Sequence, residues 1–139
     1  MALLIAALVL YLVLLVAVLA YALWKGGKDE RRGALTILAG TLSSMVVAEF
    51  GPEWNGPEIG VMTVDALALV ALVAIAYRSE KYWPIWAAAS QFVAVLTHWV
   101  IILNPAIVKT VYATAQPFWI FPILAALAVG TRAHQRSLR

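Results

Sequence analysis

The sequence lacks the residues and motifs of several well-defined chemistries. Cysteine is absent from all 139 residues, which excludes disulfides, iron–sulfur clusters, thiolate metal sites and cysteine nucleophiles. None of the patterns HExxH, GxSxG, GxxxxGK(S/T) or GxGxxG occurs, so the common metalloprotease, hydrolase, phosphate-binding and dinucleotide-binding signatures are missing. We therefore expect a protein that is not an enzyme and that has no metal site.

Charge is also scarce, and long apolar runs take its place. Only 12% of the residues are charged and 64% are hydrophobic, whereas soluble domains average about 25% charged and about half apolar. About 20 apolar residues are needed for a helix to cross a hydrocarbon core of about 30 Å. The pattern predicts an all-α, polytopic transmembrane bundle that forms a single membrane domain over residues 1–139. Its five expected spans are about 2–24, 34–50, 61–77, 85–103 and 106–130.

The positions of the basic residues predict how these spans are threaded. The first apolar run has no basic segment before it and is too long for a signal peptide, so we expect it to be a retained span. The segment 25–33, KGGKDERRG, is expected to be a cytoplasmic loop, and a basic tail follows residue 130. By the positive-inside rule, the N-terminus then lies outside and the C-terminus in the cytoplasm. A four-span arrangement is disfavoured because it would move Arg78 and Lys81 outside. Five spans place nine of the ten Lys and Arg residues on one side: Lys25, Lys28, Arg31, Arg32, Arg78, Lys81, Arg132, Arg136 and Arg139, with Lys109 opposite.

Polar residues inside the spans are the main candidates for function. Asp65, His98 and Lys109 all lie about 5–8 Å below the outer boundary at a rise of 1.5 Å per residue. Gln91 and His98 are seven residues apart and share a helix face. The structural interpretation is that Asp65 pairs with His98 or Lys109, because a lone charge in lipid is costly. The functional one is a proton relay, or a site for a small polar ligand or headgroup. The expected outer cluster contains Asp65, His98, Lys109, Tyr112 and Gln116, with Glu49 at its rim.

Three further patterns concern packing and the membrane boundary. Gly40 and Ser44 are four residues apart and are typical of close helix packing. Pro117 and Pro122 remove backbone donors and predict a bent helix. Aromatic residues in and beside the segment 78–84 predict a band at the level of the lipid headgroups. They are Tyr77, Tyr82, Trp83 and Trp86.

The C-terminal half of the sequence resembles a group of known membrane proteins. The stretches RSEKYWPIWAAASQFVAVLTHW and NPAIVKTVYATAQPFWIFPILAALAVGTR look like those of uncharacterised small polytopic inner-membrane proteins of alphaproteobacteria. The resemblance implies a location in a bacterial inner membrane. It implies no particular chemistry.

Three functional hypotheses are compatible with these patterns. The leading one is an accessory or scaffolding subunit of a larger inner-membrane complex, which contacts lipid and either other membrane subunits or further copies of itself. The second is a small oligomeric transporter or channel-like protein that uses the outer cluster, although five spans do not divide into equal inverted repeats. The third is a lipid-, quinone- or pigment-binding protein. No cofactor is predicted, because a bis-histidine haem needs two imidazoles and only His98 lies within a span. No nucleic-acid partner is expected, since anionic headgroups explain the basic segments.

Overall fold

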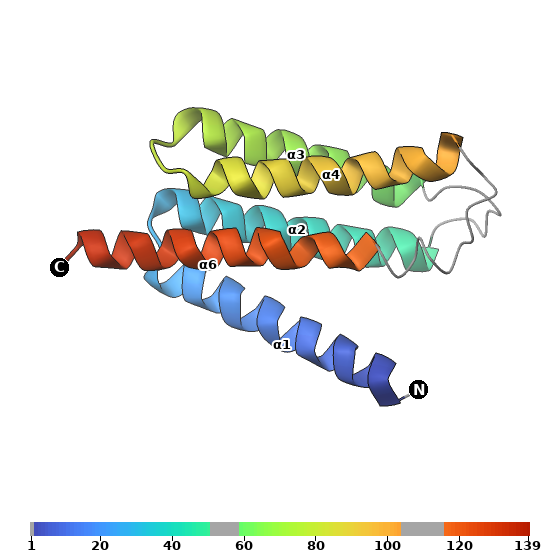
Figure 1. The fold of residues 1–139 in the computed structure, drawn as a ribbon, viewed down its shortest axis with the longest axis horizontal. Coiled ribbons are helices and arrows are strands. Elements are labelled where there is room, and N and C mark those ends of the chain that lie inside the picture. Colours follow the sequence, from blue (N-terminus) through green and yellow to red (C-terminus); the bar gives the residue numbers. More distant parts are fainter. Residues whose placement is uncertain (1, 51–58, 104–115) are drawn as a thin grey trace.

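The computed structural model describes residues 2–50, 59–103 and 116–139, and in these ranges the fold is entirely helical (Figure 1). The predicted all-α class is confirmed for this part of the chain. The elements are α1 (Ala2–Lys25), α2 (Lys28–Phe50), α3 (Ile59–Arg78), α4 (Trp83–Leu103), the 3-10 helix η1 (Gln116–Trp119) and α6 (Ile120–Ser137).

Four of these helices lie side by side, and α1 diverges from them. Figure 1 shows α2, α3, α4 and α6 running along one common direction, while α1 leaves the group at an angle. The second half of α1 packs against α2 and α6 through Leu15, Leu19 and Ala22, which are buried. Residues 5–10 of the first half are all exposed.

The core lies where these helices meet, and it consists of aliphatic side chains. Leu72 of α3 and Ile123 and Leu127 of α6 are among the most deeply buried. Large apolar side chains also cover the outside, as Val70 on α3 and Phe92 on α4 illustrate. Two helical stretches, Ile5–Lys25 and Ile59–Arg78, are long and apolar enough to cross a membrane.

Charged residues gather at one end of the molecule, here called the basic end. The α1–α2 connection, the α3–α4 connection and the C-terminus all lie at this end (Figure 1). Among the described residues, only Glu49 and Asp65 carry charge elsewhere. The charged residues of the basic end are Lys25, Lys28, Asp29, Glu30, Arg31, Arg32, Arg78, Glu80, Lys81, Arg132, Arg136 and Arg139.

Two segments that the sequence predicts as loop or tail are helical. The prediction of a loop over 25–33 is wrong beyond Gly27, because α2 begins at Lys28. The Glu30 carboxylate accepts a hydrogen bond from the Gly27 N–H, which is half of a capping box. Asp29 and Glu30 in the first turn also interact favourably with the helix dipole. Similarly, residues 131–137 are not a separate tail but the last turns of α6.

Candidate functional site

An aspartate and a histidine meet between α3 and α4, away from the basic end. Nε2 of His98 lies 2.8 Å from Oδ2 of Asp65. The His98 side chain is almost completely buried, at 1% exposure, and that of Asp65 is 21% exposed. The structure thus brings together two of the residues expected in the outer cluster, and they link two neighbouring helices.

Gln91 joins this pair from two turns earlier in α4. Its Nε2 donates hydrogen bonds to the backbone carbonyl of Asp65 at 3.1 Å and to Oδ1 at 3.2 Å. Both partner atoms are acceptors, so the amide nitrogen must face them and the amide oxygen must point elsewhere. The sequence places Gln91 on the same helix face as His98, but the predicted cluster does not include it. The seven-residue spacing is the signal that points to this role.

Asp65 and Gln91 line a cavity of about 320 Å³ that residues from α1, α2, α3, α4 and α6 enclose. Its walls are mainly apolar, with Ile37, Leu72 and Ile123 among them. The remaining polar side chains come from α1 and α2, and Tyr11 hydrogen-bonds Thr41 between these helices. These polar residues are Tyr11, Thr36, Thr41 and Ser44.

The other residues singled out in the sequence fall at several places. Lys109 and Tyr112 lie outside the described residues, as does the side chain of Gln116. Glu49 is exposed near the end of α2 that lies away from the basic end. Gly40 and Ser44 both line the cavity. Pro117 lies in η1 and Pro122 in the first turn of α6, where a missing backbone N–H leaves no helical hydrogen bond unmade.

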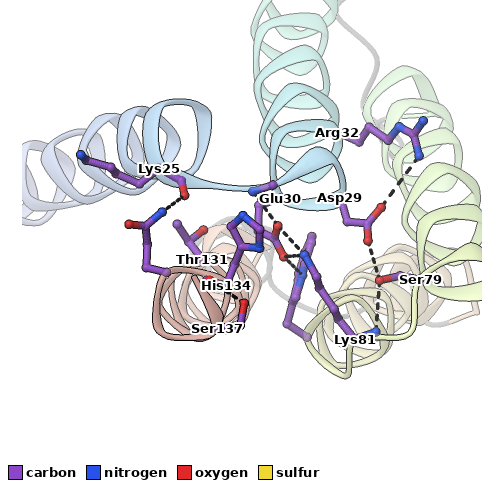
Figure 2. Close-up of polar contacts among 12 residues, drawn as sticks. Lys25, Asp29, Glu30, Arg32, Ser79, Lys81, Thr131, His134 and Ser137 are labelled. Atoms are coloured by element: carbon purple, nitrogen blue, oxygen red, sulfur yellow. Dashed lines mark hydrogen bonds and ion pairs between the residues drawn. The ribbon is translucent and has the colours of Figure 1, made fainter. Parts of the chain in front are cut away.

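A second buried acid lies at the basic end, and the sequence did not reveal it. Glu30 is completely buried, and both of its carboxylate oxygens lie 2.8 Å from Nζ of Lys81. Nε1 of Trp83 also donates to Glu30 at 2.8 Å. Figure 2 shows how the contact between Lys81 and Glu30, together with the hydrogen bond from Ser79 to Asp29, ties the first turn of α2 to the α3–α4 connection. The only sequence signal was an acid at the third position of a helix that follows a Gly pair.

Trp83 departs from the predicted aromatic band for a packing reason. Tyr77, Tyr82 and Trp86 are exposed, as expected of residues at a headgroup level, but Trp83 is only 5% exposed. Its indole ring lies against the backbone of Gly33 in α2 and Gly130 in α6, where a Cβ would overlap the ring. The absence of side chains at Gly33 and Gly130 therefore leaves the space that the Trp83 ring occupies at the junction of α2, α4 and α6.

The side chains of Asp65, His98 and Gln91 can form hydrogen bonds, and those of Asp65 and His98 can also take part in proton exchange. Within the described ranges, no group of three or more His, Asp and Glu residues could hold a metal ion. Comparisons of the chain with family models, curated proteins and solved structures gave no match.

Proposed function

We propose that the chain is a five-span protein of the bacterial inner membrane, with its N-terminus outside and its C-terminus in the cytoplasm. The distribution of polarity supports this proposal. Large apolar side chains are exposed on all the long helices, for example Val16, Met45, Val70 and Phe92. Exposure of large apolar side chains on every long helix is unusual in soluble monomers, and it suits helices that contact lipid. The basic end then faces the cytoplasm, in keeping with the positive-inside rule.

Within the membrane, the chain acts as an accessory or scaffolding subunit that works by contact. One observation carries this proposal: residues 5–10 of α1 are all exposed, whereas Tyr11 and the buried residues after it pack against α2 and α6. Leu8, Val9 and Val13 are each more than half exposed, and Figure 1 shows α1 leaving the bundle. Helices in a membrane associate through close van der Waals packing. A span anchored at one end and separated at the other therefore leaves a wedge-shaped space that a helix of a partner protein fills.

Native mass spectrometry after nanodisc extraction from the native membrane tests the subunit proposal. We expect the 15.1 kDa chain to leave the membrane in a fixed ratio with a larger membrane protein. Leu8→Trp on α1 should release that partner, whereas Val70→Trp, the matched control on an exposed face of α3, should retain it. Recovery of the native chain only as a monomer or homo-oligomer would contradict the accessory role.

The Asp65–His98 pair, in which His98 is buried and Asp65 partly buried, favours a second candidate function, a small oligomeric transporter or channel. Ionisable residues inside membrane bundles commonly mark ion or proton pathways. A flux assay in reconstituted liposomes between pH 5 and 8 brackets the ordinary histidine pKa of about 6.5. Proton flux that is lost in His98→Ala but retained in Thr63→Ala, a change on the exposed face of α3, would support transport. Absence of flux at every pH would rule it out for the isolated chain.

A further inference from the structure

We propose that the cavity lined by Asp65 and Gln91 binds the uncharged, hydroxyl-bearing head of an amphipathic molecule dissolved in the membrane. This proposal goes beyond the accessory role and does not depend on it. The apolar tail of the ligand extends from the cavity into the surrounding lipid.

The size and composition of the cavity match those of small-molecule sites. Its volume of about 320 Å³ lies at the lower end of the range of about 300–1,000 Å³ for ligand pockets. Such pockets are mostly apolar and carry a few polar groups that orient the ligand. Here the apolar walls include Ala68, Leu72 and Ile123, and the polar lining residues come from α1, α2, α3 and α4.

Gln91 supplies an acceptor that no described residue satisfies. The side chain is only 7% exposed, and its amide nitrogen is fixed on Asp65 by two hydrogen bonds. Its Oε1 accepts no hydrogen bond from the described part of the chain, although the residue lines the cavity. The cavity walls around this atom are mainly apolar, and an acceptor without a donor is unfavourable in such surroundings once water is excluded. A hydroxyl group on a ligand supplies the missing donor.

The charges around the cavity select an uncharged head. No lysine or arginine is among the described residues that line it, and the one charged group is the Asp65 carboxylate. An anionic head would be repelled by this carboxylate and would find no basic partner among the described residues that line the cavity. His98 and Gln91 already engage the two carboxylate oxygens, so a cationic head would compete with existing contacts. The hydroxyls of Tyr11, Thr41 and Ser44 provide hydrogen bonds for a second oxygen on the ligand.

The cavity reaches the outer surface of the bundle on the side of α2. Met45 and Ala48 line it, and both are also exposed on the outside of the molecule. In the proposed membrane this surface faces lipid tails rather than water. A molecule that dissolves in the bilayer can therefore enter from the side, with its tail left among the lipids.

Binding of radiolabelled 4-octylphenol to the isolated chain in nanodiscs tests the proposal. Binding above that of protein-free nanodiscs should saturate at one molecule per chain. Octylbenzene lacks the hydroxyl, and octyl sulfate carries a negative charge. Both should compete at least about tenfold more weakly than unlabelled 4-octylphenol. Competition by octylbenzene at equal strength, or binding that does not saturate, would overturn the proposal.

Matched variants locate the bound probe. Ser44→Leu fills the cavity and should abolish saturable binding, whereas Ser43→Leu, one residue away on an exposed face of α2, should retain it. Gln91→Met removes the acceptor and should weaken binding about tenfold. Circular dichroism checks that each variant remains helical. If Gln91→Met does not fold, the two serine variants and the competition series decide, and equal binding by both serine variants would overturn the assignment.

Two kinds of membrane lipid could supply a hydroxyl-bearing head, and analysis of the lipids that co-purify with the chain from its native membrane distinguishes them. A phenolic lipid of quinol type and a glycerol-based lipid with a free hydroxyl differ in mass and in ultraviolet absorption. Either lipid, recovered in an amount that falls in Ser44→Leu but not in Ser43→Leu, would support the proposal. The 4-octylphenol measurement uses the isolated chain and does not depend on a partner protein. A negative result in the co-purification experiment therefore contradicts the accessory role without contradicting the ligand site, and the reverse also holds.

Discussion

Two acidic side chains, Asp65 and Glu30, are each held by partners from a distant part of the chain. Asp65 of α3 contacts His98 and Gln91 of α4. Glu30 of α2 receives hydrogen bonds from Lys81 and from Trp83 at the start of α4. Neither set of partners is adjacent in the sequence, so each acid fixes the relative position of two helices. Their importance for stability can be measured residue by residue.

At Glu30 we predict a large loss of stability on truncation. Glu30→Ala leaves the Trp83 indole N–H without its buried acceptor and leaves Lys81 unpaired. Removing one partner of a buried ion pair costs about 3–5 kcal/mol, and we expect about 3 kcal/mol because Lys81 is partly exposed. Unfolding in mixed micelles, followed by circular dichroism, provides the measurement. Glu80→Ala at an exposed neighbouring position is the control. A similar change in both variants would show that the buried contacts contribute little.

For Asp65 and His98 we predict energetic coupling. Asp65→Ala and His98→Ala should each lower the unfolding free energy by about 1–2 kcal/mol, the upper range for polar contacts between membrane helices. The double variant should lose less than the sum, because both single changes break the same contact. A double-mutant cycle in mixed micelles measures this difference. Additive losses would mean that the 2.8 Å contact contributes no stability of its own.

At the scale of helices, the junction around Trp83 sets how closely α2, α4 and α6 approach. The indole occupies space that Gly33 and Gly130 leave free, and its N–H donates a hydrogen bond to Glu30. A single side chain thus combines packing against two helices with a hydrogen bond to a buried acid. A helix junction of this kind tolerates no added volume.

We predict that alanine at Gly33 or Gly130 destabilises the protein, although alanine normally favours a helix. Gly33→Ala and Gly130→Ala should each cost about 1–3 kcal/mol, the usual range for overpacking a core. The control is Gly40→Ala, where the new Cβ would lie 3.7 Å from that of Ala68, an ordinary contact. Gly40→Ala should gain up to about 1 kcal/mol from reduced backbone entropy. Equal effects at all three glycines in thermal unfolding would contradict the packing assigned to Trp83.

The sequence predicted helical elements better than their ends and their contacts. Apolar runs were long enough to indicate α1, α3 and α4, because hydrophobicity alone decides such segments. The start of α2 was missed, since KDERR looks like a solvated loop until Glu30 is seen buried against Lys81 and Trp83. Trp83 was placed in an interfacial band for a similar reason. Burial of a single aromatic residue depends on glycines far away in the sequence, which no local pattern reveals.

The candidate site was predicted by depth, and its contacts emerged from the fold. Equal depth in two spans suggested that Asp65 and His98 lie at one level, and the structure adds their contact and the role of Gln91. The cavity beside them could not have been predicted. Its walls come from α1, α2, α3, α4 and α6, and helical periodicity within one segment does not tell how five segments pack.

For the whole molecule, the separation of charge from apolar surface is the central feature. Nearly all described charges lie at the basic end, and apolar side chains cover the flanks of the helices. This asymmetry supports the proposed orientation, because basic residues are retained on the cytoplasmic side. It also leaves Asp65 as the one described acid between the basic end and the far end of the helices, where Glu49 lies.

Labelling of single cysteines in intact bacterial spheroplasts tests this orientation most directly, and the natural absence of cysteine makes it clean. Glu49→Cys at the end of α2 and Ser137→Cys at the end of α6 are both at exposed positions. We predict that a membrane-impermeant maleimide labels Glu49→Cys in intact spheroplasts and labels Ser137→Cys only after permeabilisation. Labelling of Ser137→Cys in intact spheroplasts, or recovery of the chain in the soluble fraction, would contradict the proposed orientation in the membrane.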